Sequence, residues 1–414
     1  MNHVAVAIVG GGPSGLTAAT ALAAQVDGEI LVLEREARTG GIPRHSDHLG
    51  YGMRDLRRFI TGPAYAGRLT AMASEAGAVL ETEAMVTGWA GDRTLQITSP
   101  RGVRTVTADA VILATGARER PRPARLIPGD RPDGVYTTGQ LQNLVHLHHG
   151  RVGERAVIVG AELVSWSAVL TLREAGCATA AMITGHRRAE AYAAFRVPGR
   201  LLMDGPVLTH SRLVAIHGKG RVRSVTVERT DTGERREIAC DTVVFTGDWI
   251  PDHELARTAG LQMDRGTRGP VVDAALRTSK PGVFAVGNLC HPVDTADGAA
   301  LDGRHVASAV AAWLRSGDEA DISPAAAQIR TEAPLRWVAP QLVSSDGGLP
   351  ARGDLLLWTD EYRRLPRLRA TQDGRVLAVK RTPWPAAPGR IFRAPWSLVA
   401  DADPKGGDIT LSLA

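Results

Sequence analysis

A glycine-rich turn near the start of the chain constrains the fold more than any other feature of the sequence. An unbroken apolar run over residues 4–9 predicts a buried parallel strand, and the segment GGGPSG follows it directly. A helix is expected next, from Pro13 to about Ala24, and then a second apolar strand over residues 29–33 that ends at Glu34. A strand, a glycine turn, a helix and a second strand with an acidic end form the βαβ unit that binds a dinucleotide.

Each glycine of this turn has a different expected role in forming the phosphate site. Gly10 permits the tight turn, Gly12 lets a pyrophosphate approach the backbone, and Gly15 lets the helix pack closely on the strand. The helix starts at Pro13 and Ser14, so its free N–H groups and the positive end of its dipole point at the phosphates. Further contacts to the same cofactor are expected from Glu34, Arg35, Gly41, Ile42 and Val86.

Two later segments indicate which dinucleotide is bound. The apolar run 110–114 ends in Ala-Thr-Gly, and the run 283–286 is followed by Gly-Asn, so both are expected to return to the first turn. FAD needs such an additional strand end because its ribityl and isoalloxazine portion is long. A helix that begins near Asp297 and runs to Trp313 would stabilise the negative charge of a reduced flavin with its N-terminus. The FAD contacts expected here are Ala114, Thr115, Gly116, Gly287, Asn288, Asp297, Gly298 and Ala299.

A second domain begins in the same way, but its dinucleotide fingerprint is incomplete. A strand that ends at Gly160 leads through a turn into a helix over residues 163–174. Glu162 occupies the second glycine position, so a carboxylate would face the pyrophosphate. Arg187 and Arg188 follow the next strand, where arginines accept the 2′-phosphate of NADP. Glu162 outweighs these arginines, so NAD(P) binding is the less favoured interpretation and stays open.

The length of 414 residues, with 44% hydrophobic and 22% charged residues, predicts more than one packed domain. We expect an α/β protein with two Rossmann-like three-layer domains, the second inserted in the first, and a small β-rich C-terminal module. Residues 316–334 are rich in alanine, proline and polar residues and are interpreted as a linker. The expected boundaries are 1–118 for the first part of the FAD-binding domain, 119–248 for the NAD(P)-like domain with the degenerate fingerprint, 249–330 for the second part of the FAD-binding domain and 331–414 for the module.

Composition excludes several function classes. The formal net charge is +5, aromatic residues are 4% and the arginines are scattered, so no nucleic-acid partner is expected. Cys177, Cys240 and Cys290 are far apart and odd in number, which argues against a disulfide framework and against a cysteine-only metal site. A reducing cytoplasm fits this cysteine usage, and no metal ligand is assigned. No apolar stretch approaches the ~20 residues that a membrane helix needs, so no membrane span is expected.

Several longer segments together resemble one group of flavoproteins. They read GGGPSGLTAA (10–19), GGIPRHSDHLGYG (40–52), ATGARERPR (114–122), TTGQLQNLV (137–145), VIVGAELVSWSAVLTLREAG (157–176) and VFAVGNLCHPVDTADGAALDGRHVA (283–307). The chain resembles the two-dinucleotide-binding-domain flavoproteins of the thioredoxin-reductase-like group. Within that group it resembles most the flavoprotein subunits of hydrogen cyanide synthase, opine oxidase and dye-linked proline dehydrogenase, the last through its α subunit.

This resemblance carries expectations about cofactor, reaction and partners. It implies FAD in the first domain, a second domain that has lost its nicotinamide partner, and oxidation of an amine, amino acid or hydroxy acid. It also implies assembly with a small iron–sulfur protein and a second flavoprotein subunit. Asn288 stands where the wider reductase group has aspartate, and no CxxC pair occurs, which excludes disulfide reduction of the thioredoxin reductase type.

A flavin dehydrogenase needs a group that takes the proton from the nitrogen or oxygen of its substrate. Histidine suits this task near neutral pH. One loop of the first domain carries His45, His48 and Tyr51, and the loop after Asn288 carries His291. Both loops are expected near the flavin, so these four residues are the catalytic candidates, while an ordinary polar role for each histidine stays open.

Three functions remain open at this point. The favoured one is an FAD-dependent oxidoreductase subunit of the dehydrogenase or oxidase type, which moves a hydride from a small-molecule substrate to flavin N5 and passes electrons to a partner or another acceptor. The second is an NAD(P)H-dependent flavin reductase. The third is a non-catalytic FAD-binding partner, or electron-relay subunit, of a hetero-oligomeric dehydrogenase.

Overall fold

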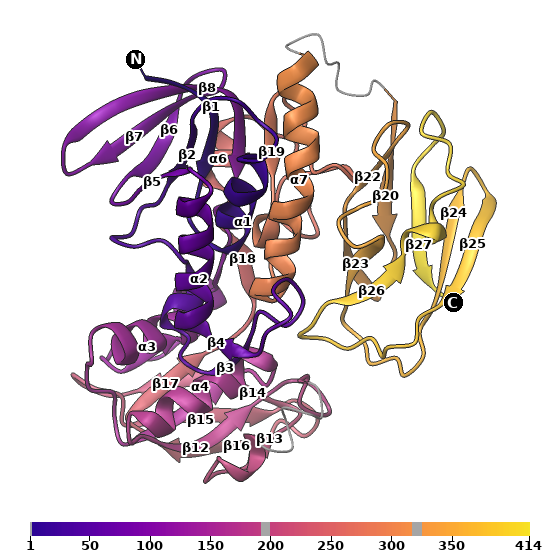
Figure 1. The fold of residues 1–414 in the computed structure, drawn as a ribbon. Helices are drawn as coiled ribbons and strands as arrows, with labels where there is room; N and C mark the ends of the chain where they lie inside the picture. The colour runs from indigo at the N-terminus through magenta and orange to yellow at the C-terminus, as the bar shows by residue number, and fades with distance from the viewer. Residues whose placement is uncertain (1, 192–198, 317–324) are drawn as a thin grey trace. The chain divides into compact units, whose positions relative to one another are not determined.

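The computed structural model describes residues 2–191, 199–316 and 325–414 (Figure 1). Its internal contacts divide the chain into two units. Unit 1 combines Met1–Arg44, Gly50–Ala117 and Pro251–Ala414, and unit 2 combines His45–Leu49 and Arg118–Ile250. One α/β unit is therefore inserted into the sequence of the other, as the sequence predicts. The C-terminal module belongs to unit 1 in this division. The four expected domain boundaries stay a prediction.

Unit 1 contains a seven-stranded sheet. Its strands are β1 (Asn2–Val9), β2 (Ile30–Leu33), β5 (Val79–Glu81), β6 (Met85–Gly91), β7 (Thr94–Ser99), β8 (Gly102–Leu113) and β19 (Val283–Ala285). The order is β5-β2-β1-β8-β7-β6, and β19 pairs with β8. The strands β5, β2, β1, β8 and β19 pair in parallel, so the carboxyl ends that precede the Gly10 turn, Glu34, Ala114 and Gly287 meet at one edge of the sheet.

The sequence predicts only the last part of β8, residues 110–114. The first half of this strand pairs antiparallel with β7, whereas its second half pairs parallel with β1 and β19. An antiparallel strand with one solvated face alternates polar and apolar residues. The first half of β8 therefore lacks the continuous apolar run by which the second half was recognised.

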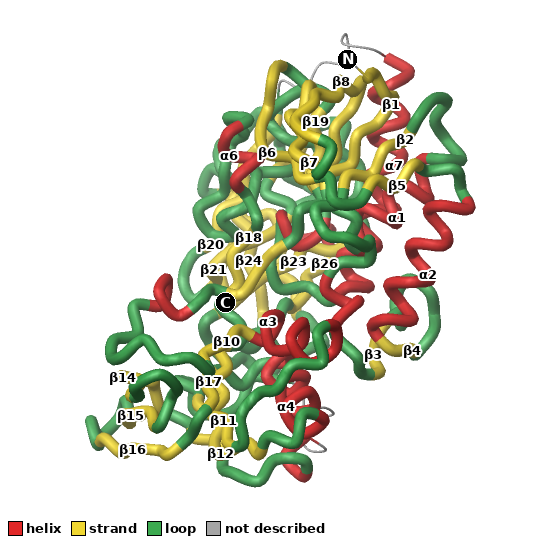
Figure 2. Tube along the Cα trace, turned by 90° about the vertical axis from the view of Figure 1, so that its left-hand side faces the viewer, coloured by secondary structure: helices red, strands yellow, loops and turns green. Residues whose placement is uncertain are grey.

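Helices of unit 1 lie beside this sheet (Figures 1 and 2). They are α1 (Pro13–Leu22), α2 (Gly62–Glu75), α6 (Glu254–Thr258) and α7 (Ala296–Ser316). α1 packs against both α2 and α7. The short elements β4 (Ile60–Thr61) and η4 (Gly287–Leu289) also belong to unit 1. Four other short elements span a boundary between the units in the sequence: η1 (Ile42–His45), β3 (Leu49–Tyr51), β9 (Ala117–Glu119) and β18 (Trp249–Pro251). Of the helices in the described residues, none has the length and apolar character that crossing a bilayer requires.

Unit 2 is built around a five-stranded parallel sheet in the order β10-β17-β11-β12-β13. These strands are β10 (Val135–Thr137), β11 (Arg155–Val159), β12 (Ala178–Ile183), β13 (Val207–Leu208) and β17 (Thr242–Phe245). An antiparallel meander joins it, formed by β14 (Ser211–His217), β15 (Ser224–Arg229) and β16 (Arg235–Ala239). The helical elements are α3 (Thr138–Gln142), α4 (Leu163–Glu174), η2 (Arg122–Arg125) and η3 (Asn143–Leu147).

The C-terminal region is β-rich, as the sequence predicts. One sheet contains β20 (Ala326–Thr331), β22 (Leu342–Ser344), β24 (Arg367–Gln372), β25 (Arg375–Arg381) and β27 (Ile409–Leu413), and the other contains β21 (Leu335–Ala339), β23 (Asp354–Thr359) and β26 (Phe392–Pro395). A short helical turn, η6 (Trp396–Leu398), follows β26. Apolar side chains of both sheets share one core cluster, which includes Ile329, Leu357 and Leu411. The interpretation of residues 316–334 as a linker is wrong for residues 326–331, because β20 pairs with β22 and β27, while residues 317–324 lie outside the described residues.

Candidate functional site

The first glycine turn is packed too closely for any side chain at two of its positions. Gly10 has φ +109°, and a Cβ atom there would overlap the carbonyl oxygen of Ala114 at the end of the neighbouring strand. A Cβ atom on Gly15 would overlap the carbonyl oxygen of Gly10. Helix α1 therefore starts directly against the ends of β1 and β8, which is the packing that a dinucleotide cradle needs.

Gly12 differs from its neighbours because it faces open space. The nearest atom to a Cβ atom built on Gly12 is the Cα atom of Gly41, at 4.0 Å. Gly12 is the N-cap of α1, in an extended conformation, and Pro13 and Ser14 form the first helical turn. Free backbone N–H groups of this helix end thus border a space that no side chain fills, as a pyrophosphate site requires.

Glu34 is held at the same turn. Its carboxylate is 6% exposed and accepts backbone hydrogen bonds from Gly11 and Glu36, both at 2.9 Å. The carbonyl of Glu34 accepts from the N–H of Ala84 at 2.9 Å. Val86 follows two residues later in β6, and its side chain is buried in the core. These contacts bring the predicted ribose ligand to the phosphate turn.

Arg35 and Ile42 lie more at the surface. The Arg35 side chain is 59% exposed and its Nη2 atom is 3.5 Å from Asp252 Oδ2. Ile42 is 43% exposed in η1, directly after Gly41. The loop between them is tied to the turn, since the N–H of Gly40 donates to the Gly11 carbonyl at 2.7 Å.

The two later strand ends return to this turn, as expected. A Cβ atom on Gly287, which has φ +68°, would lie 2.7 Å from Ser14 Oγ and 3.3 Å from the Cβ atom of Ala299. The Ala-Thr-Gly end of β8 is tied to the chain after β18, because Thr115 Oγ1 donates to the Asp252 carbonyl at 2.7 Å and Gly116 accepts from the Asp252 N–H at 2.9 Å. Ser14, Ala114, Gly287 and Ala299 therefore lie together around the first glycine turn, and their contact with FAD stays a prediction.

The N-terminus of α7 is surrounded by charged side chains. Asp297 is 4% exposed and accepts from the N–H groups of Gly298, at 2.9 Å, and Arg54, at 3.1 Å. Asn288 does not point freely into the site: its amide donates to the Asp294 carbonyl at 2.9 Å and accepts from the Asp294 N–H at 3.1 Å. Asn288 thereby holds the loop between η4 and α7, and a bond from it to a ribityl hydroxyl remains a prediction.

The geometry of this turn matches what FAD requires in three respects. The glycine turn is tightly packed at Gly10 and Gly15 and open at Gly12. The end of β19, at Gly287, lies against the same turn. A buried carboxylate stands at the ribose position. The residues present therefore fit FAD, with Gly12 and the start of α1 at the pyrophosphate and the loop before α7 at the flavin end.

His291 is buried rather than open to a substrate. It is 3% exposed, its Nε2 atom is 2.5 Å from Asp302 Oδ2, and its Nδ1 atom is buried without a hydrogen-bond partner among the described residues. A cavity of about 20 Å³, lined in part by His291, Asp302 and Arg352, lies beside it and has room for one water molecule. Burial also raises the pKa of the neighbouring Cys290 thiol, so this cysteine is not a ready nucleophile.

The other two histidine candidates belong to unit 2. His48 is half-buried, and its Nδ1 atom is 2.9 Å from the Leu49 carbonyl, which can only accept. Nδ1 therefore carries the proton, and Nε2 accepts from Ser167 Oγ at 2.7 Å. Burial lowers the pKa of His48, which favours its neutral form. His45 is also half-buried, and its carbonyl is 2.5 Å from His146 Nδ1.

Several residues of these networks have no motif in the sequence. Ser167 Oγ also accepts from Gln142 Nε2 at 2.7 Å, which orients it toward His48.

Tyr51, the fourth candidate, lies in unit 1 with its ring 5.9 Å from that of Tyr65. Tyr65 is fully buried and donates to Asp55 at 2.5 Å. Only the segment 40–52 pointed to this region, because hydrogen bonds between distant segments leave no local pattern.

The equivalent turn of unit 2 is filled by a side chain. A Cβ atom on Gly160 would lie 2.8 Å from Glu162 Oε2, and one on Gly247 would lie 2.6 Å from Glu162 Oε1. The Glu162 carboxyl thus occupies the space between two glycines at the N-terminus of α4, where the first cradle is open. Burial raises its pKa. Arg187 and Arg188 are exposed after β12.

Two further carboxyl groups are buried near Glu162. Burial, together with the neighbouring Glu162, raises the pKa of Glu190 to about 8, and Thr184 Oγ1 donates to Glu190 at 2.8 Å. Burial raises the pKa of Glu119 to about 7, although the Gly139 N–H donates to it at 2.9 Å. Each of the three carboxyls has one buried oxygen without a hydrogen-bond partner in the described residues. Unlike the turn at Gly12, this turn is therefore occupied by a carboxyl group of the chain itself.

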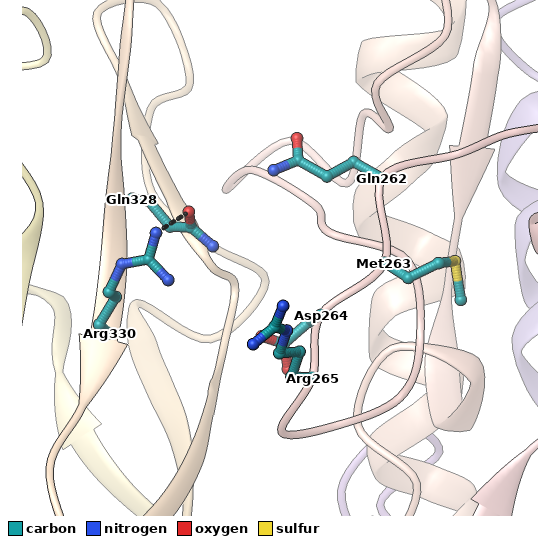
Figure 3. Close-up of a pocket in the computed structure, with 6 residues that line it drawn as sticks. All are labelled: Gln262, Met263, Asp264, Arg265, Gln328 and Arg330. Carbon is teal, nitrogen blue, oxygen red and sulfur yellow. Dashed lines mark hydrogen bonds between the residues drawn. The ribbon is translucent and has the colours of Figure 1, made fainter.

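A separate pocket of about 360 Å³ lies in unit 1 between the loop before β19 and strand β20 (Figure 3). Its lining residues are Gln262, Met263, Asp264, Arg265, Gln328 and Arg330. Arg330 is paired with Asp408 and donates to Gln328 at 3.1 Å, and Asp264 accepts from Thr267. Arg330 and Asp264 are thus bound within the protein, and the pocket contains none of the predicted site residues.

Comparison with known proteins places the chain among flavin-dependent oxidoreductases. Residues 4–313 match the family described as pyridine nucleotide-disulphide oxidoreductase. The benzene 1,2-dioxygenase system ferredoxin–NAD(+) reductase subunit of Pseudomonas putida is 28% identical over 299 residues, which are 70% of this chain and 67% of that protein. The matching opine oxidase subunit of Agrobacterium tumefaciens is 27% identical over 343 residues, 74% of this chain and 65% of that protein, so the chain spans less than two thirds of this relative.

Solved structures agree on the fold. Thioredoxin reductase of T. acidophilum superposes with a TM-score of 0.64 at 22% identity, covering 75% of this chain and 99% of that one. L-Proline dehydrogenase from P. horikoshii superposes with a TM-score of 0.57 at 18% identity, covering 74% of this chain and 55% of that one. These similarities show the thioredoxin-reductase-like two-domain fold.

Proposed function

Because the chain belongs to the pyridine nucleotide-disulphide oxidoreductase family and is an FAD-dependent oxidoreductase, we propose that it oxidises a small amine, amino acid or hydroxy acid and passes the electrons to a partner protein or another acceptor. Within the family, we place it with the flavoprotein subunits of hydrogen cyanide synthase, opine oxidase and dye-linked proline dehydrogenase. Its three free cysteines lack a CxxC pair, so the chain does not reduce disulfides as thioredoxin reductase does.

One observation carries the proposal: the two glycine turns differ in what fills them. In unit 1, Gly12 faces open space, with the nearest atom at 4.0 Å, whereas in unit 2 the Glu162 carboxyl lies between Gly160 and Gly247. A nicotinamide dinucleotide would have to displace a buried acidic group to enter the second turn. Reducing equivalents therefore reach the flavin from a substrate that does not need that turn.

The proposed roles of the residues follow from their positions. Gly10, Gly12, Gly15 and the start of α1 would hold the pyrophosphate, Glu34 the ribose, and the loop before α7 the flavin end. When bound, FAD supplies the acceptor for the substrate hydride. His48 is the proposed proton acceptor, because its tautomer is set by the Leu49 carbonyl and its neutral form is favoured. His291 is buried at 3% exposure, so we assign it a positioning role.

Anaerobic reduction of the purified yellow protein tests the proposed function. We expect the flavin absorbance near 450 nm to bleach with at least one member of a panel of amines, amino acids and 2-hydroxy acids, and to persist for minutes with NADH or NADPH. Photoreduction of the same sample is the control that the flavin can be reduced. Complete bleaching by NADPH within seconds would overturn the proposal and establish a flavin reductase.

The reductase is the second candidate function. The exposed Arg187 and Arg188 after β12 favour it, because arginines at that place accept a 2′-phosphate, and the relative from Pseudomonas putida is named a ferredoxin–NAD(+) reductase subunit. Bleaching by neither donor class would instead support the electron-relay subunit.

The relatives named as subunits support assembly with other chains, and we propose a small iron–sulfur protein and a second flavoprotein subunit as these partners. The reduced cysteines support a cytoplasmic location.

Replacing His48 by glutamine tests the proposed proton acceptor. We expect turnover to fall by about 10²–10⁴-fold with little change in flavin content, because glutamine cannot accept a proton. Burial lowers the pKa of His48 below its ordinary value of 6.5, so wild-type activity should persist to a lower pH than an ordinary histidine allows and then fall as His48 becomes charged. The exposed His148 provides the matched control, H148Q, which should behave as wild type. An unchanged pH profile in H48Q would contradict the assignment.

A further inference from the structure

An arginine of the C-terminal module reaches the first turn of α7. Arg352 lies in the segment between β22 and β23, and its side chain is 9% exposed. Its Nη2 atom donates to the Gly298 carbonyl and lies 3.1 Å from Asp294 Oδ2 and 3.4 Å from Asp302 Oδ1. One guanidinium therefore contacts a carbonyl of the helix and two carboxylates beside it.

Both carboxylates depend on a nearby cation. The side chains of Asp294 and Asp302 are 4% and 3% exposed. A buried carboxylate without a cationic partner is strongly disfavoured. Burial alone would raise the pKa of Asp302, yet His291 and Arg352 lower it to about 2, so this group is ionised at neutral pH.

The other cations near these carboxylates are more exposed and more distant. Arg54 Nη1 is 3.6 Å from Asp294 with a side chain 39% exposed, and Arg393 Nη2 is 4.0 Å away with a side chain 29% exposed. Water screens an exposed pair more than a buried one. Arg352 is therefore the principal compensating charge for Asp294.

Contacts continue from these carboxylates to residues of the proposed flavin site. Asp302 Oδ2 accepts from the Gly287 N–H at 3.2 Å, and Gly287 lies against Ser14 at the first turn. The backbone of Asp294 is bonded to the Asn288 side chain, and a Cβ atom on Gly298 would overlap the Asp294 carboxylate. Arg352 thus contacts Asp294 in the loop before α7, and it also contacts Asp302, whose carboxylate accepts from the Gly287 N–H.

We propose that Arg352 is a positioning residue for the flavin: it compensates Asp294 and Asp302, so that the N-terminus of α7 keeps its positive potential toward the flavin and the Gly287 segment keeps its place. The inference rests on the proposed function, which puts the flavin end of FAD at this helix. A reduced flavin carries negative charge, which an uncompensated carboxylate beside the helix end would repel. The C-terminal module therefore acts on the cofactor through this arginine.

The test compares R352Q with wild type and with R336Q. Arg336 is a matched control in the same module, since it pairs with Asp360 at 3.7 Å at the surface, with side chains 50% and 61% exposed. For R352Q we expect the dissociation constant of FAD to rise by about tenfold or more and the flavin midpoint potential to fall. R336Q should match wild type in both. The double variant R352Q/D294N should regain part of the affinity and of the potential, because one of the unpaired charges is gone.

The outcomes separate this inference from the function it rests on. Wild-type protein that binds no FAD would overturn the proposed function and this inference with it. Wild-type protein that binds FAD, with R352Q unchanged in affinity and potential, would overturn the inference alone, as would a lower melting temperature of R352Q without a flavin effect. Should R352Q not fold, the single variant D294N is decisive: its midpoint potential should rise, and an unchanged potential would overturn the proposal.

Discussion

Replacing Gly12 by alanine is expected to leave the apoprotein folded and to weaken FAD binding by ~100-fold or more, which corresponds to about 2.7 kcal/mol. A Cβ atom at this position meets no protein atom within 4.0 Å, and the backbone is extended, so alanine fits the empty turn. The added methyl group would occupy the space where the pyrophosphate must approach the backbone. Titration of the apoprotein with FAD, followed by flavin fluorescence, measures the loss.

Two other glycines provide the comparison. A Cβ atom on Gly15 would overlap the carbonyl oxygen of Gly10, so G15A should fail to pack α1 and should lower the melting temperature as well as flavin content. Gly67 lies exposed within α2 with no atom within 4 Å of an added Cβ, so G67A should stabilise the chain by about 0.5–1 kcal/mol with no change in FAD affinity. FAD affinity in G12A equal to that in G67A would show that the pyrophosphate lies elsewhere.

The stability of unit 2 is expected to fall as the pH rises from about 4.5 to about 8. Burial raises the pKa of Glu190 from 4.5 to about 8 and that of Glu119 to about 7, so both keep their protons in the folded state after the unfolded chain has lost them. A raised carboxyl pKa therefore leaves the free energy of unfolding unchanged at a pH below the pKa of the unfolded chain. It lowers the free energy of unfolding by its full amount at a pH above the pKa of the folded state. For Glu190 the penalty is on the order of 5 kcal/mol.

The variant E190Q isolates this effect. Glutamine cannot ionise and can still accept the hydrogen bond from Thr184, so E190Q should melt at a higher temperature than wild type at pH 8.5 and nearly as wild type at pH 4.5. E234Q removes an exposed carboxylate of the same unit and should follow the wild-type curve. Parallel curves for E190Q and wild type across this range would show that Glu190 is ionised when folded.

Under the proposed function, the buried Glu162 carboxyl accounts for why the second glycine turn takes no dinucleotide. Both units start with a strand, a tight glycine turn and a helix, and in both the helix N-terminus favours an anion. In unit 1 that place is open for a ligand, and in unit 2 the chain fills it with its own Glu162. The two turns therefore share a strand, a glycine and a helix N-terminus, and they differ in whether a side chain of the protein fills the space between them.

Turns, helices and strands that depend on residues close together in the sequence could be predicted without the structure. Helix α4 has the expected bounds, α1 ends at Leu22 rather than about Ala24, and Glu162 stands in the second turn as its place in the sequence implies. The reason is local: glycine spacing sets backbone turns, and apolar runs set buried strands, over only a few residues. The first half of β8 and the strand β20 were missed because their polar alternation resembles loop sequence.

The candidate chemistry depended on segments far apart in the chain. The bond between His48 and Ser167 spans more than a hundred residues, and Arg352 of the module meets Asp294 and Asp302 only in the folded chain. Burial and charge pairing arise from such meetings, and they decide whether a histidine is neutral or a carboxyl keeps its proton. The local pattern therefore sufficed for the fold and the first cradle, whereas the protonation states and the role of the C-terminal module followed from long-range packing, which no short stretch of sequence encodes.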